Sequence, residues 1–135
     1  MNPDCPGASM RLPPAVICNL FALFLVGGCT APPPPPKPGP PPLKISFRKS
    51  QLPLQGLVAG INNPSSSETI RVVAVFVQGV NEPGERSHRL DYELKPLDSI
   101  TVGWKELDGW KLKDQDKLRI RCEGYTGDYN CVVKE

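Results

Sequence analysis

The chain has 135 residues, is 39% hydrophobic and carries a net charge of +2 at pH 7, with acidic and basic residues interspersed. This pattern argues against nucleic-acid binding, because the densest basic stretch, residues 105–121, also contains four acidic residues. The composition changes twice along the chain, which divides it into segments 1–28, 29–42 and 43–135. The last segment, about ninety residues long, can bury one modest core but not a deep active site, so we expect no enzyme.

The first segment has the layout of a secretory signal. A single arginine precedes the apolar run Pro14–Val26, and two glycines follow before Cys29. The first nine residues contain an acidic side chain where a signal is normally positive. Translation from Met10 is therefore an alternative to a start at Met1.

The tetrapeptide VGGC at positions 26–29 resembles the lipobox of bacterial lipoproteins. The resemblance implies that residues 1–28 are removed, that Cys29 carries a diacylglycerol, and that acyl chains such as palmitate hold the protein in the cell envelope. Thr30 stands where enterobacterial lipoproteins carry an aspartate for inner-membrane retention, which favours the outer membrane in such a host. The alternatives are an ordinary secretory signal or an uncleaved transmembrane helix, for which the apolar run is short.

Residues 29–42 join the cysteine to the folded segment. Nine of the thirteen residues 30–42 are proline, which fixes φ and lacks an N–H, so the pattern predicts an extended polyproline II tether. At about 3.1 Å per residue the tether would reach on the order of 40 Å. We expect a spacer; a ligand for a proline-binding partner is the alternative.

From residue 43 onward, apolar and polar residues alternate between turn-forming clusters, which predicts strands and no long helix. The expected strands are 44–49, 56–62, 70–78, 87–94, 99–104, 117–122 and 129–134. Seven short antiparallel strands favour an all-β sandwich of immunoglobulin or fibronectin type, with a small closed barrel as the alternative. Residues 94–104, LKPLDSITVGW, resemble a strand–turn–strand passage of bacterial immunoglobulin-like envelope domains.

The alternation also predicts which side chains face the core. The inward set is Ile45, Phe47, Leu57, Ala59, Ile61, Leu90, Tyr92, Leu94, Ile100, Val102, Trp104, Leu118 and Ile120. The strand 70–78 is apolar on both faces between Val72 and Val77. This predicts a central strand or one whose outer face is covered by a loop or a partner.

Two of the five cysteines, Cys122 and Cys131, fall in the folded segment. An even pair in an oxidising compartment predicts a disulfide. A turn centred on Thr126 and Gly127 would place the two cysteines opposite each other in a hairpin, where a bridge would contribute about 2–3 kcal/mol. A metal or redox site is the alternative, although C-x-x-C spacing and a nearby histidine are missing.

The folded segment offers little for catalysis or metal binding. The single histidine, His88, is expected at the core edge or exposed at the start of a strand, without a nucleophile beside it. The run KDQDK at 113–117 lacks the glycine and closing glutamate of a calcium loop, so we expect a turn there. We predict no catalytic residue, no metal site and no cofactor.

Aromatic residues are the best candidates for a binding surface. Trp110, Tyr125 and Tyr129, with Asp128 between the two tyrosines, would contact an envelope protein or a cell-wall glycan through ring faces. Packing is the alternative for Trp110. The sequence thus predicts a lipid-anchored, non-catalytic binding or structural module. The second hypothesis is an inhibitor or adaptor that inserts the Cys122–Cys131 hairpin into a secreted enzyme.

Overall fold

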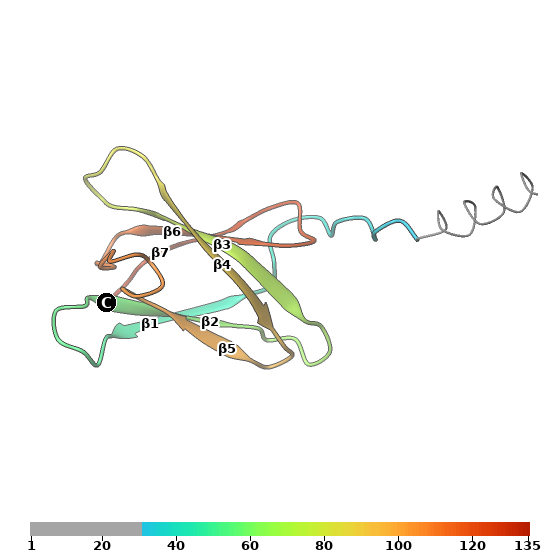
Figure 1. The fold of residues 1–135 in the computed structure, drawn as a ribbon, viewed down its shortest axis with the longest axis horizontal. Helices are drawn as coiled ribbons and strands as arrows, with labels where there is room; N and C mark the ends of the chain where they lie inside the picture. Colours follow the sequence, from blue (N-terminus) through green and yellow to red (C-terminus); the bar gives the residue numbers. More distant parts are fainter. Residues whose placement is uncertain (1–30) are drawn as a thin grey trace, which may run out of the picture. The chain divides into compact units, whose positions relative to one another are not determined.

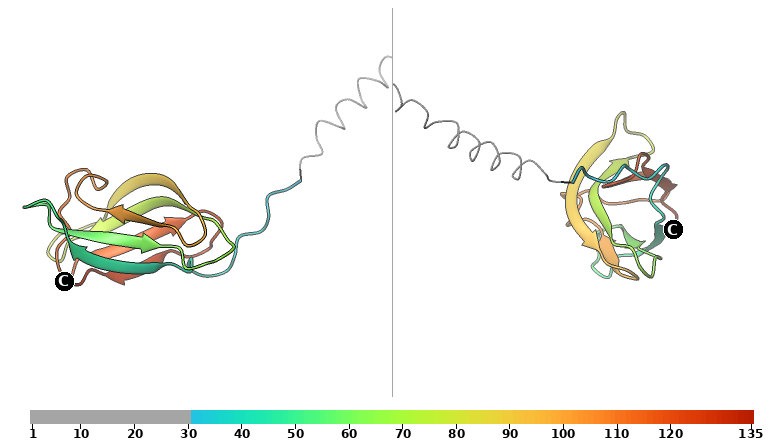
Figure 2. Two further views of the ribbon diagram at one scale, coloured as in Figure 1. Left: turned by 90° about the horizontal axis from the view of Figure 1, so that it is seen from below. Right: turned by 90° about the vertical axis from the view of Figure 1, so that its right-hand side faces the viewer.

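The computed structural model describes residues 31–135, which contain seven strands and no helix. The strands are β1 (Lys44–Lys49), β2 (Leu57–Asn62), β3 (Ile70–Gln78), β4 (Arg86–Leu94), β5 (Ser99–Val102), β6 (Lys117–Cys122) and β7 (Tyr129–Val132). They form two antiparallel sheets, ordered β1-β2-β5 and β4-β3-β6-β7, which lie face to face (Figures 1 and 2). The predicted all-β sandwich is confirmed. Three strands have the predicted bounds, and the other four differ by one or two residues at one end.

The predictions for the signal peptide, for the start at Met10 and for Cys29 lie outside the described residues. Within residues 31–135, no helix is long and apolar enough to cross a membrane.

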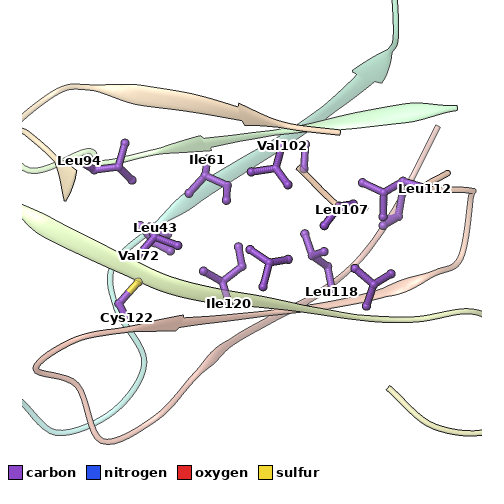
Figure 3. Packing of buried hydrophobic residues seen from close by; sticks show 14 of the residues in the cluster. Leu43, Ile61, Val72, Leu94, Val102, Leu107, Leu112, Leu118, Ile120 and Cys122 are labelled. Carbon is purple, nitrogen blue, oxygen red and sulfur yellow. The ribbon is translucent and has the colours of Figure 1, made fainter. Parts of the chain in front are cut away.

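The core fills the space between the two sheets (Figure 3). Its fully buried large side chains are Ile61, Ile70, Val72, Val75, Val77, Leu94, Val102, Leu107, Leu112, Leu118, Ile120 and Val133. Every side chain predicted to face the core is buried or packs against it, except Tyr92 and Trp104. Period-two alternation therefore assigned the faces correctly along most of the strands.

The exceptions arise where the chain leaves regular strand geometry. Tyr92 is exposed on β4, an edge strand whose pairing with β3 is interrupted by a bulge and in which Asp91 has a φ of 48°. A bulge bends and twists a strand locally. Trp104 is exposed because β5 ends at Val102 and the chain then turns. Leu107, from this turn, fills the core instead.

The outer face of β3 is covered by side chains of its own sheet. β3 lies between β4 and β6, as expected of a strand that is apolar on both faces. The guanidinium carbon of Arg119 lies 3.8 Å from the centroid of the Phe76 ring, and that of Arg121 lies 5.0 Å away. These cation–π contacts cover the ring while the charged groups stay near water.

The predicted disulfide is wrong. In the β6–β7 pairing Cys131 lies opposite Leu118, and Tyr129 opposite Ile120. Cys122 lies four residues along β6 from Leu118, the residue opposite Cys131, which is a distance of roughly 13 Å along the strand. A disulfide needs Cα atoms about 4.4–6.8 Å apart. The hairpin turns about two residues earlier than predicted. Both cysteines are free thiols, and burial raises the pKa of Cys122 to about 12 and that of Cys131 to about 11.

The proline-rich segment does not stay free as far as residue 42, because residues 37–42 pack on the β6–β7 turn as a strap. The Lys37 N–H donates to the Gly124 carbonyl at 2.7 Å, and the Lys37 carbonyl accepts from the Thr126 N–H at 3.0 Å. Pro41 is buried. A Cβ at Gly127 would lie 3.2 Å from the backbone of Gly39, so glycine allows this close approach. The folded unit accordingly begins at Pro35 rather than at residue 43.

Candidate functional site at the loop end

The antiparallel connections gather the loops at two ends of the sandwich. The β1–β2 loop (50–56), the β3–β4 loop (79–85) and the β5–β6 loop (103–116) lie at one end, named here the loop end (left in Figure 1). The strap and the turns 63–69, 95–98 and 123–128 lie at the other, named the strap end. The chain enters the sandwich at the strap end, and residues 133–135 lie at the loop end, where Val133 and Glu135 bond to the β5–β6 loop.

Exposed apolar side chains gather at the loop end. Each of its three loops carries at least one: Leu52 and Leu54 in the first, Val80 in the second and Trp104 in the third. Among the described turns of the strap end, the exposed large apolar residue is Leu97. Sequence alternation missed these residues because it describes strands. An apolar Leu-Pro-Leu inside a turn, where polar residues are usual, was the available signal.

Trp110 is a packed residue of the β5–β6 loop, not a free aromatic platform. Its indole Nε1–H donates to the buried Asp116 carboxylate at 3.3 Å. The Arg86 guanidinium carbon lies 4.7 Å from the ring centroid. A Cβ at Gly79 would lie 3.3 Å from Cζ2 of the indole. The packing alternative for Trp110 therefore describes the structure better than ring-face recognition does.

Around Trp110 the β3–β4 and β5–β6 loops enclose an open hollow of about 670 Å³. The charged side chains that line it are Glu82, Arg86, Asp108, Lys111, Lys113, Asp114 and the buried Asp116. The hollow thus carries three basic and four acidic side chains. Its polar rim therefore suits a neutral or zwitterionic surface better than a strongly charged one.

His88 connects the β5–β6 loop to β4. Its ring is buried, and Nδ1 lies 3.0 Å from Oδ2 of Asp108, whose side chain is exposed. Nε2 is buried without a hydrogen-bond partner in the described part of the chain. Asp108 has a φ of 50° and is followed by Gly109 at 87°. The contact between His88 and Asp108 thus fixes the left-handed backbone conformation of Asp108 and Gly109, directly before Trp110.

The predicted surface residues do not form one site. Tyr125, Asp128 and Tyr129 lie at the strap end or beside it on β7, whereas Trp110 lies at the loop end. The Nζ atom of Lys37 in the strap lies 5.8 Å from the Tyr125 ring centroid. Tyr129 is half-buried against the core. These two aromatic residues are therefore partly occupied by contacts within the chain.

Asp128 belongs to an ion-pair network on the outer face of the larger sheet. It accepts from Arg121 Nε at 3.2 Å and is also paired with Arg119, which in turn donates through Nε to Glu85 at 3.1 Å. Burial raises the pKa of Asp128, but hydrogen bonds from Arg121 and Arg119 outweigh it and hold that pKa below its ordinary value. The hydrogen bond from Arg119 likewise lowers the pKa of Glu85.

The network predicts an acid-dependent loss of stability. Because the pKa values of Asp128 and Glu85 are depressed by folding, their stabilisation is present above their ordinary values of 3.8 and 4.5 and is lost as the pH falls through the lower folded values. Urea unfolding between pH 7 and pH 2 should show a smaller decline for Asp128→Asn than for the wild type. Glu123→Gln, which removes an exposed pair with Arg71, is the control and should decline like the wild type.

The described residues contain no group of three or more His, Cys, Asp or Glu side chains placed to hold a metal ion. By its architecture the chain is a small two-sheet β-sandwich with an apolar-tipped loop end. A scan against protein-family models gave no match, and searches of curated proteins and of solved structures gave none either.

Proposed function

We propose that the protein is a lipid-anchored module of the bacterial cell envelope that binds a partner, without catalysis, through its loop end. The observation that carries the proposal is the distribution of exposed apolar side chains, which come from all three loops of that end. Apolar anchors surrounded by a mixed-charge rim are the usual composition of a protein–protein interface. The VGGC motif at 26–29 supports the lipid anchor.

A protein partner is favoured over a cell-wall glycan. Glycan recognition commonly needs an open aromatic face for a sugar ring, and the Arg86 guanidinium already lies over the indole of Trp110. The exposed residues Leu52, Leu54 and Val80 are aliphatic. Such side chains contribute by burial in an apolar pocket, which proteins provide more readily than polysaccharides do.

The adaptor hypothesis, with the β6–β7 hairpin inserted into a secreted enzyme, has less support. It relied on a loop made rigid by a Cys122–Cys131 bridge, and these residues are free thiols. The strap also pairs with the turn at Gly124 and Thr126. An inserting hairpin would have to keep or displace that contact, so the loop end is the better candidate.

A pull-down from cell envelopes tests the loop-end proposal. The wild-type chain should retain a partner at high salt, and the double variant Val80→Ser/Trp104→Ser should lose most of it, because truncation of interface anchors costs about 2 kcal/mol or more. Leu97→Ser, which changes the exposed leucine of the strap end, is the matched control. Equal recovery with the double variant and the wild type would contradict the proposal.

A further inference from the structure

We propose that residues 52–54, Leu-Pro-Leu, form the tip that inserts into an apolar pocket of a partner protein; this inference rests on the proposed function of the loop end. Leu54 is 85% exposed and Leu52 is 59% exposed, on either side of Pro53. Full burial of one leucine side chain stabilises a complex by roughly 1.5–3 kcal/mol. Two leucines presented together therefore make a strong anchor.

The loop that presents the tip is held in one conformation. The Ser50 N–H donates to the Gly56 carbonyl at 3.0 Å, and the Leu52 N–H donates to Ser50 Oγ at 3.2 Å. Gly56 has a φ of 76°, and a Cβ there would lie 2.7 Å from the Leu112 carbonyl oxygen. With Pro53 restricting the tip further, little conformational entropy remains to be lost on binding.

The leucine at position 54 stabilises neither the backbone conformation of the loop nor the core. Its φ of 69° is left-handed, a conformation that costs a non-glycine residue roughly 1–2 kcal/mol and that Asn or Gly adopts more readily. Its apolar side chain also lies in water. Leu97 shares both properties, so the feature that distinguishes the tip is its second exposed leucine, Leu52, two residues away.

The charges beside the tip favour a protein over a lipid surface. Residues 52–54 line one side of a depression of about 440 Å³. Its rim carries Lys49, which is ion-paired with Glu135, and Lys113 next to Asp114. These charges cancel, whereas an apolar tip that enters anionic membranes is normally surrounded by excess Lys and Arg. A balanced polar rim around an apolar centre matches a protein interface.

Leu97 provides a matched control. It also follows a proline, has a φ of 61° and is 72% exposed, but it lies at the strap end. Leu54→Asn and Leu97→Asn therefore relieve the same backbone strain and remove the same side chain. Both variants should keep the melting temperature of the wild type or raise it slightly.

The test places a benzophenone amino acid at position 52 or at position 97 of the full-length chain in the producing cells. Irradiation should give one protein adduct from position 52 and none from position 97. With that adducted protein purified, Leu54→Asn should weaken its binding at least about tenfold, and Leu97→Asn by less than about twofold.

An adduct with phospholipid, an adduct with a second copy of the chain, or no adduct at position 52 would overturn the inference. Unchanged affinity of Leu54→Asn would overturn it as well. If binding then still requires Val80 and Trp104, the loop-end proposal stands without the tip. If it requires none of these residues, both proposals fail.

Discussion

A full-length chain with Cys29→Ser is expected to leave the membrane fraction. Under the lipoprotein proposal this thiol carries the diacylglycerol, and no other attachment is needed. Each buried CH₂ contributes about 0.8 kcal/mol, so two or three acyl chains hold a protein in a bilayer almost irreversibly. Without them, the chain should accumulate as unprocessed precursor or be released in soluble form, and it should incorporate no labelled palmitate.

Cys18→Ser is the matched control for this experiment, because Cys18 lies within the segment expected to be removed. This variant should be processed and labelled like the wild type. Palmitate labelling that persists in Cys29→Ser would contradict lipidation at this residue. Membrane retention without label would instead favour an uncleaved transmembrane helix.

Asp116→Ala is expected to lower the free energy of unfolding by about 2 kcal/mol, since two part-buried donors lose their acceptor and a buried donor left without an acceptor costs about 1–3 kcal/mol. The Asp116 carboxylate is buried and accepts from the Lys113 N–H at 3.0 Å and from the Trp110 indole at 3.3 Å. Its loss should also free the indole. Urea unfolding followed by tryptophan fluorescence measures both effects.

Asp116→Asn separates the hydrogen bonds from the charge. One amide oxygen can accept from both donors at the position that Oδ2 now occupies. We expect Asp116→Asn to retain most of the free energy of unfolding of the wild type. A loss as large as that of Asp116→Ala would mean that the negative charge, not the acceptor, matters at this site.

Much of the fold could be predicted because alternation reports directly on burial. β1, β3 and β6 begin and end where the pattern does, and the inward residues predicted for β2 and β6 are all buried, together with Val58 and Cys122. The prediction was wrong where a bulge changes which side chains of a strand face the core, or where a turn changes the direction of the chain. The β3–β4 bulge, the turn after Val102 and the early turn of the β6–β7 hairpin leave no clear mark in residue periodicity.

The candidate site could be predicted only in part. Trp110 was singled out from its residue type, and it does line the hollow. The Trp110 ring is covered by Arg86, which is distant in sequence, so this contact follows from the tertiary fold. The same holds for the strap, since proline composition predicts an extended chain but not the surface on which it lies.

The docked strap also determines how far the folded domain can lie from its proposed attachment point at Cys29. The chain is fixed from Lys37 onward, so if Cys29 carries the lipid as proposed, the seven residues 30–36 would join the lipid to the domain. They span roughly 20 Å, about half the reach of the whole proline-rich segment. Under the lipoprotein proposal, this short connection would keep the domain within a thin layer at the membrane and raise its local concentration there. The proposed partner would therefore be one that resides in, or is held close to, the same membrane.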